Sequence, residues 1–295
     1  MSVQIVTVPY ASGRPDFRTG RGPGHLVRHG FAQSLRDAGV PVGTLQSIGL
    51  PPDRDTEVES LFALHERLSY AVRTVVSQGD FPLILAGNCS STVGAVSGLD
   101  KDGLGVLWFD AHGDYNTPET TATGYLDGMA LSILTGQCWR RMAENIKGFE
   151  PIDEDRILHL GGRHFDDEEN ILIHRSNLYL LLNEDLRTQG IAPLLRDGLR
   201  SLRDAGVERV HLHFDLDVLD PTEAPANFHE NSAGLSVAGA LEAITLVRQY
   251  FPLASAAFTA YDPAYDPENS TVEAAKRLAR ALFLPVESSG TDSQA

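Results

Sequence analysis

The chain has 295 residues, enough to bury a sizeable core, and its composition of 42% hydrophobic and 22% charged residues is ordinary for a globular protein. Its formal net charge of −16 disfavours nucleic acid as a partner, because an acidic surface repels phosphate backbones. Only two cysteines occur, Cys89 and Cys138, which excludes a disulfide framework. The N-terminal segment does not read as a signal peptide, and no apolar run reaches the roughly 18 residues of a membrane span. We therefore expect a cytoplasmic protein with no membrane partner.

Short apolar runs alternate with segments of helical period along the chain. The apolar runs predict buried strands at residues 3–8, 81–86, 105–109, 157–160, 178–182, 210–214 and 256–260. Amphipathic patterns between them predict helices at residues 56–78, 192–205, 237–250 and 271–284. Strands that alternate with helices form right-handed crossovers, so the sequence predicts an α/β fold with a parallel sheet covered by helices on both faces.

The pattern predicts one domain, residues 1–286, because no internal repeat and no linker interrupts it. The Gly- and Arg-rich stretch at residues 12–24 predicts a loop, which is a candidate cover for a site. The segment 287–295, rich in Ser, Gly and Asp, predicts a disordered tail. Ligands of parallel sheets bind outside the carboxyl ends of the strands, so functional residues are expected just after the predicted strands.

A first candidate metal-binding segment, DAHGD at residues 110–114, follows one of these strands. Residues two apart point to the same face of an extended chain, so Asp110, His112 and Asp114 can converge. The alternative interpretation is that the aspartates at a strand end are turn formers or helix caps.

A second segment, HLHFDLD at residues 211–217, ends another strand, and the same period places His211, His213, Asp215 and Asp217 on one face. Taken alone, it also fits an ordinary strand histidine beside a turn. Two such segments at one sheet edge bring many carboxylates together, and their repulsion favours bound cations. Oxygen-rich ligation with one or two imidazoles suits Mn²⁺ better than a structural zinc.

At this point the sequence resembles a known family. Residues 110–114 are similar to the DAHxD motif of arginases and agmatinases, and FDLD at residues 214–217 is similar to their FDxD motif. The resemblance extends from about residue 81 to residue 266. It implies a three-layer α-β-α fold with a parallel sheet of about eight strands. It also implies a hydrolase that uses two Mn²⁺ ions against a guanidino-type carbon.

By position, the resemblance also implies which residues hold the metals. Asp110 and Asp215 would bridge the two ions, and Asp114 would complete the shell of one of them. His112 and Asp217 would belong to the other ion. The nucleophile would be the hydroxide that the metals share, because two cations lower the pKa of their common water.

The first departure from the family pattern is at residues 86–90, which read AGNCS where the family usually has GGDHS. Cys89 therefore stands at the position of a metal-binding histidine. The alternative is a small buried thiol. We favour ligation, because a thiol beside a dication loses its proton and binds the metal. A thiolate is negative where imidazole is neutral, so it would make that metal a weaker Lewis acid.

The second departure is in residues 116–128, which resemble the arginase stretch NTPxTTxSGNLHG. Asp127 occupies the place of its histidine, to which proton transfer is usually assigned. A carboxylate with an ordinary pKa near 4 suits this task only if burial raises its pKa. His229, in the loop after the second metal segment, is an alternative acid or base, unless it is simply a surface histidine.

The third departure is AYDP at residues 260–263, where arginases and agmatinases carry EVNP or EVSP. Ala260 replaces the glutamate that faces the guanidinium, which leaves that charge without its partner. Either Glu230 or Asp127 compensates, or the head group of the substrate is less basic. Together the departures resemble a small branch of the family, the N-hydroxyarginine amidinohydrolases of antibiotic biosynthesis, which carry the cysteine and lack the proton-transfer histidine.

Two further matches predict the residues that bind the α-carboxylate and α-ammonium end of the substrate. Asn116 and Thr123 match arginase residues that contact the α-carboxylate. Residues 160–169 resemble the arginase segment IGLRDVDPGE, in which Asp166 would receive the α-ammonium and Glu169 would support it. The alternative is a helix start whose acidic residues suit the helix dipole. Agmatine has no α-carboxylate, so these residues favour an arginine-like amino acid.

The predicted reaction converts N-hydroxy-L-arginine or L-arginine to ornithine plus hydroxyurea or urea. Agmatine, guanidinobutyrate and formiminoglutamate are alternative substrates of the same site. A pseudoenzyme that binds metal or ligand without turnover is an alternative of another class, because two histidines and a glutamate are replaced. Arginase relatives are often trimers or hexamers, but no interface can be identified from the sequence, so a monomer and a homo-oligomer both stay open.

Overall fold

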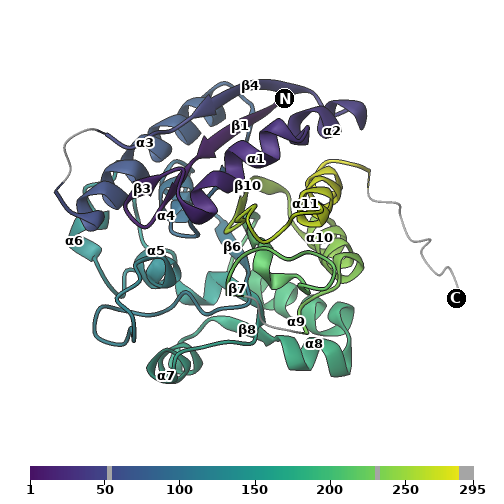
Figure 1. The fold of residues 1–295 in the computed structure, drawn as a ribbon. Helices are drawn as coiled ribbons and strands as arrows, with labels where there is room; N and C mark the ends of the chain where they lie inside the picture. Colours follow the sequence, from purple (N-terminus) through teal and green to yellow (C-terminus); the bar gives the residue numbers. More distant parts are fainter. Residues whose placement is uncertain (52–54, 230–232, 286–295) are drawn as a thin grey trace, which may run out of the picture.

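The computed structural model describes residues 1–51, 55–229 and 233–285. Its centre is an eight-stranded sheet in the order β4-β1-β5-β10-β9-β6-β7-β8, and all of its strand pairs are parallel (Figure 1). The strands are β1 (Val3–Val8), β4 (Val42–Ser47), β5 (Phe81–Ala86), β6 (Leu104–Phe109), β7 (Ile157–Gly162), β8 (Tyr179–Leu182), β9 (Arg209–Asp215) and β10 (Leu253–Thr259). The predicted α/β fold with a parallel sheet is confirmed.

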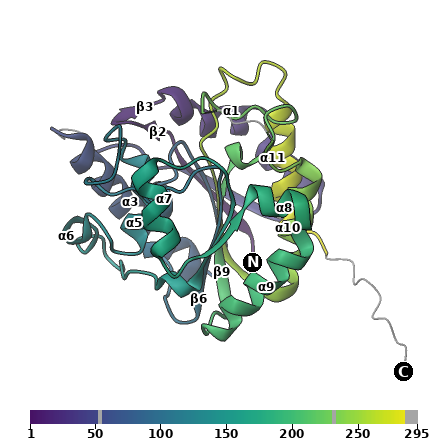
Figure 2. The ribbon, with the colours of Figure 1, turned by 90° about the horizontal axis from the view of Figure 1, so that it is seen from below.

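Helices cover both faces of the sheet, which gives three layers (Figure 2). One face carries α1 (Gly22–Arg28), α2 (Phe31–Asp37), α8 (Asn183–Gln189), α9 (Ile191–Asp204), α10 (Val237–Tyr250) and α11 (Ser270–Ala281). The other face carries α3 (Glu57–Ser77), α4 (Ser91–Ser97), α5 (Ala130–Leu134), α6 (Arg140–Ala143) and α7 (Asp167–Arg175). Each face buries its own apolar cluster.

The strand β5 shows why the central strands read as unbroken apolar runs. All of its residues are buried. Leu83 and Leu85 join the apolar cluster on one face of the sheet, whereas Ile84 and Ala86 join the cluster on the other. A strand buried on both faces needs apolar side chains at every position, because neither side of its pleat meets water.

Two differences from the prediction lie in the N-terminal part of the chain. The edge strand β4 was not predicted: all its residues after the first are exposed, so it carries no apolar run. The stretch 12–24, predicted as a loop, instead completes a short hairpin of β2 (Tyr10–Ala11) and β3 (Arg14–Pro15), then forms a 3₁₀ helix and the start of α1. Pro23 stands in the first turn of α1, where its missing N–H costs nothing.

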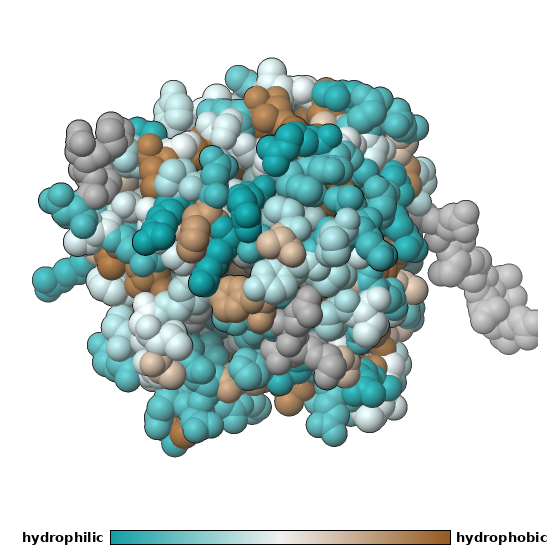
Figure 3. Space-filling view, in the orientation of Figure 1, coloured by the Kyte–Doolittle hydropathy of each residue, from teal (hydrophilic) through white to brown (hydrophobic). Residues whose placement is uncertain are grey.

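This stretch packs closely against the loop after β5. A side chain on Gly87 would meet the Cα of Gly20 at 2.7 Å and the carbonyl oxygen of Tyr10, just before the stretch, at 2.2 Å, so only glycine fits there. Figure 3 shows that apolar residues on one face of the molecule are scattered among hydrophilic ones. No helix of the described ranges is long and apolar enough to cross a membrane. The predicted tail at 287–295 lies outside the described residues.

Candidate metal centre and active site

The residues that follow several central strands converge on a cavity of about 300 Å³. All site residues predicted from the sequence line this cavity except Asp110: Cys89, His112, Asp114, Asn116, Thr123, Asp127, Asp166, Glu169, Asp215, Asp217 and His229. Asp110 is buried and accepts a hydrogen bond from the backbone N–H of His112, which does line the cavity.

The segment 110–114 is a turn, and the extended geometry expected for it is wrong. The strand β6 ends at Phe109, and Asp114 has a left-handed backbone with a φ of 49°. The carboxylate of Asp110 shapes the turn, since it accepts from the backbone of His112 at 2.7 Å and from the indole N–H of Trp108 at 3.0 Å. A turn built around its own carboxylate therefore brings these side chains together, in place of strand alternation.

The second metal segment stays in the strand as far as Asp215, so the strand alternation expected to continue to Asp217 does not reach that residue. Asp215 is the last residue of β9, and Asp217 lies in a 3₁₀ turn, Leu216–Val218. The backbone N–H of Asp217 donates to Asp215 Oδ1 at 2.7 Å. Asp217 Oδ2 lies 3.3 Å from His112 Nδ1. It also accepts from the side-chain amide of Asn227 at 3.2 Å. The two metal segments thus meet through His112 and Asp217.

Cys89 lies in the loop between β5 and α4 and points toward the carboxylate at the end of β9. Its side chain is buried, and Sγ is 2.8 Å from Asp215 Oδ2 and 3.3 Å from Thr259 Oγ1. Burial, and then the nearby Asp215, raise the pKa of the Cys89 thiol in the absence of a cation. A cation beside this sulfur would reverse that effect.

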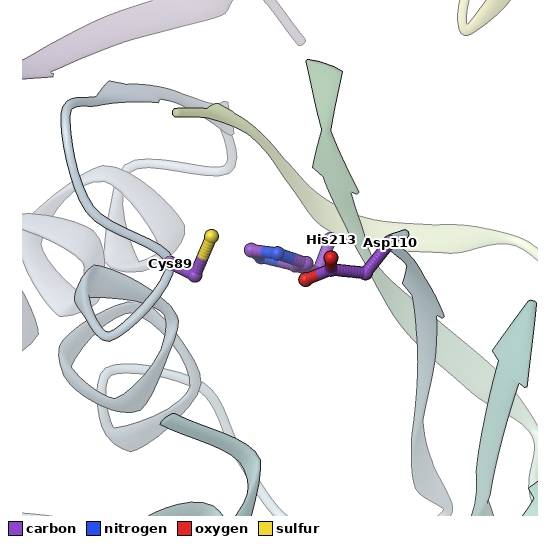
Figure 4. A group of neighbouring side chains, drawn as sticks. All are labelled: Cys89, Asp110 and His213. Carbon is purple, nitrogen blue, oxygen red and sulfur yellow. The ribbon is translucent and has the colours of Figure 1, made fainter. Parts of the chain in front are cut away.

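Two groups of potential ligand atoms share Asp110. Cys89, Asp110 and His213 form one, and Asp110, His112 and Asp217 form the other, with all ligand atoms of a group within 4.8 Å of one another. Figure 4 shows the first group, in which the His213 ring lies between Cys89 and Asp110. Apart from His213, these are residues to which the sequence assigned metal ligation.

The electrostatics of the site fit bound cations. Burial and neighbouring carboxylates raise the pKa values of Asp114 and Asp215 well above their usual range. Among the described residues, Asp114 Oδ2 and His112 Nε2 are buried without a hydrogen-bond partner. Crowded carboxylates with unpartnered buried ligand atoms are costly without counter-charge, so this donor set is suited to divalent metal ions.

The two candidate proton-transfer residues differ in burial. Asp127 is buried, and its two oxygens accept from the backbone N–H groups of Cys89 at 3.1 Å and Ser90 at 2.8 Å. Burial raises the pKa of Asp127 to about 6. His229 is exposed, with its ring centroid 5.5 Å from that of His112. Glu230, the other candidate to replace the lost glutamate, lies outside the described residues.

The residues predicted for the amino-acid end form a linked group. Asn116 donates to Asp166 Oδ2 at 3.1 Å. The buried Glu169 accepts from the backbone N–H groups of Tyr115 at 2.8 Å and Asp166 at 3.2 Å, and burial raises its pKa to about 7. Thr123 is exposed, and its hydroxyl accepts from the backbone of Tyr125 at 3.2 Å. Glu169 thus ties the start of α7 to the loop after β6.

Several residues that complete the site were not predicted from the sequence. Asn227 holds both Asp217 and the carbonyl oxygen of Ala260, at 2.9 Å, and these partners are 10 and 33 residues away in the chain. No local pattern marks such a residue. Phe228 lines the cavity and lies under the Arg18 guanidinium at 4.9 Å, so the stretch 12–24 does reach the site.

Known proteins match this chain over nearly its whole length. A sequence model of the arginase family matches residues 1–284. Arginase from Staphylococcus aureus is 28% identical over 96% of this chain and 97% of its own, and arginase from Bacillus subtilis is 29% identical over the same shares. The crystal structure of the Bacillus subtilis arginase has a TM-score of 0.88 at 28% identity, covering 97% of this chain and 99% of its own. The arginase of Bacillus caldovelox also has a TM-score of 0.88, at 26% identity, covering 96% and 98%.

The chain belongs to the arginase family, as the resemblance of its motifs predicted. It is a ureohydrolase, a metal-dependent hydrolase of linear amidines.

Proposed function

We propose that this ureohydrolase uses two Mn²⁺ ions to convert N-hydroxy-L-arginine to ornithine and hydroxyurea, in preference to L-arginine. Cys89, Asp110, Asp114 and Asp215 would hold one ion. Asp110, His112, Asp215 and Asp217 would hold the other. When bound, the pair of cations supplies an activated water for attack on the guanidino-type carbon.

The observation that carries the substrate preference is Ala260. It lines the cavity, at the position of the family's glutamate, and offers a methyl group in place of a carboxylate. A fully charged guanidinium would lose its charge-assisted partner there, whereas an N-hydroxyguanidine is less basic and loses less. Asp127 is a poor substitute for the missing glutamate, because both of its oxygens already accept backbone hydrogen bonds.

The amino-acid end would be held by Asn116, Thr123 and Asp166, through the α-carboxylate and the α-ammonium. The link from Asn116 to Asp166 supports this assignment, since it presents an amide and a carboxylate side by side. As the carbon–nitrogen bond breaks, the departing ornithine nitrogen needs a proton. Asp127 and His229 both line the cavity and are the candidates to deliver it.

The test is turnover of N-hydroxy-L-arginine, L-arginine and agmatine by the manganese-loaded protein, followed by release of ornithine or putrescine. We expect N-hydroxy-L-arginine to have the highest kcat/KM and agmatine to be inert. Ala260→Glu should shift the preference toward L-arginine by roughly tenfold or more, because it restores the charged partner. Ala260→Gln introduces a side chain of the same size as glutamate but without its charge, so it should not shift the preference.

A higher kcat/KM on L-arginine in the unmodified protein would overturn the substrate assignment. Agmatine turnover would remove the role of Asn116, Thr123 and Asp166 as an amino-acid site. Inactivity on all three, with two metals bound, would favour another substrate of the same metal centre or a non-catalytic protein.

A further inference from the structure

His213 is the member of the Cys89 group to which neither the sequence motifs nor the proposed function assigns a role. It lies on β9 two residues before Asp215, and therefore on the same face of the strand. Its side chain is fully buried. A nitrogen of its ring lies within 4.8 Å of both Cys89 Sγ and a carboxylate oxygen of Asp110, and Figure 4 shows the ring between these two side chains.

The ring of His213 is held in place from two sides. Its Nδ1 is 2.7 Å from Thr92 Oγ1, and the ring stacks on the indole of Trp108 with 3.7 Å between centroids and 18° between planes. If the Thr92 hydroxyl accepts from Nδ1–H, the lone pair of the ring is at Nε2. A histidine whose one nitrogen donates to a fixed acceptor is the usual state of a metal-binding imidazole.

The Nε2 of His213 has no hydrogen-bond partner among the described residues. That feature alone does not identify a ligand, because the Nε2 of the buried His211, on the same strand and face, also has none. His211 hydrogen-bonds Ser255 at 2.6 Å and belongs to neither potential ligand group. What distinguishes His213 is its place beside a thiol and a carboxylate that point at one spot.

We propose that His213 is an imidazole ligand of the metal held by Cys89 and Asp110. This inference rests on the proposed two-metal function. Cys89 replaces a histidine of the family pattern, and His213 would return an imidazole to the same metal from β9, which is separated from β5 by β10 in the sheet. The donor set at this metal then combines thiolate, imidazole and carboxylate, so it is softer than the set around His112 and Asp217.

The experiment measures metal binding directly, with MnCl2 and CoCl2 added to the metal-free protein. Calorimetry gives the number of ions and their affinities, and X-ray absorption of the cobalt-loaded protein gives the imidazole signal per metal. His213→Gln is compared with His211→Gln, a matched change of a buried histidine on the same strand and face. Circular dichroism of the metal-free proteins checks that both variants fold.

We expect the unmodified protein to bind two ions, each with an imidazole. His213→Gln should lower the affinity for one ion by roughly tenfold or more and lower the imidazole signal per metal by about half. His211→Gln should change neither the affinities nor the imidazole signal. Two ions bound with an imidazole at only one of them in the unmodified protein would overturn the His213 assignment alone, and that measurement needs no variant. Failure of the unmodified protein to bind two ions would count against the proposed function as well.

Discussion

The carboxyl group of Asp127 both holds a loop in place and lines the cavity. Both of its oxygens accept N–H groups of the loop that carries Cys89, so it fixes that loop. It also lines the cavity, and burial raises its pKa to about 6, much closer to neutrality than an ordinary carboxyl. His229 also lines the cavity, but its side chain is exposed.

We therefore predict that Asp127 is the proton-transfer residue. Asp127→Asn keeps the size of the side chain and should lower kcat by about 100-fold or more with a smaller effect on KM. His229→Gln should lower kcat by less than about tenfold. Steady-state kinetics with N-hydroxy-L-arginine tests this, with metal content measured in each variant, because Asp127 also holds the Cys89 loop. A large loss in His229→Gln beside a small loss in Asp127→Asn would reverse the assignment.

At this scale the sequence predicted which side chains gather but not how. Asp110, His112 and Asp114 were expected to converge through strand alternation, yet a turn around the Asp110 carboxylate brings them together. His213 was predicted to lie on the same strand face as Asp215 and Asp217. The sequence alone, however, does not distinguish a metal-binding histidine on a buried strand from a histidine of the core. Asn227 was missed because its partners are set by the tertiary fold.

Among the elements, the helix α7 shows how a helix start is tied to the site. Its Glu169 is buried and accepts from the backbone N–H of Tyr115, next to Asp114, and from that of Asp166. Burial outweighs these hydrogen bonds and raises the pKa of Glu169 from 4.5 to about 7. The folded protein therefore holds a proton on Glu169 more tightly than the unfolded chain does, so ionisation of this group costs stability.

The pH dependence follows from this pKa. The contribution of the Glu169 proton is present below about pH 4.5 and is lost as the pH rises through about 7. Glu169→Gln cannot ionise, so the free energy of unfolding of the unmodified protein should fall by about 2 to 3 kcal/mol relative to this variant between pH 5 and pH 8. Urea unfolding at a series of pH values measures the difference. Glu168→Gln, an exposed neighbour in the same helix turn, is the control and should show no such trend; an equally flat difference for Glu169→Gln would contradict the prediction.

Burial separates the strands that could be predicted from the sequence from the one that could not. Strands such as β5 and β6 were predicted because every residue in them is buried, so their sequences are apolar throughout. The edge strand β4 exposes its side chains, and nothing in its composition separates it from a loop. The stretch 12–24 looked irregular from its Gly and Arg content, but its contacts with Gly87 and Phe228 arise only in the folded chain.

In the molecule as a whole, the residues of the proposed metal centre come from strands that are far apart in sequence. Cys89 follows β5, Asp110 follows β6 and Asp215 ends β9, so cations bound among them would link the central strands of the sheet. Burial of this site, and then repulsion between its carboxylates, raise the pKa values of Asp114 and Asp215. Metal binding should therefore stabilise the whole fold, since the unfolded chain does not preassemble the site.

Two sites, each occupied at a free metal concentration of about 100 times its Kd, would add about 5 kcal/mol to the free energy of unfolding. For a chain of this size we predict that chelation lowers Tm by about 8 °C relative to the manganese-loaded protein, measured by calorimetry at constant pH. Asp110→Asn removes a carboxylate common to both ligand groups and should lose most of this difference. Asp220→Asn, outside the cavity, should keep it. A Tm that does not respond to chelation, in a protein that demonstrably binds two ions, would mean that the metals do not couple the central strands and that packing of the sheet alone sets its stability.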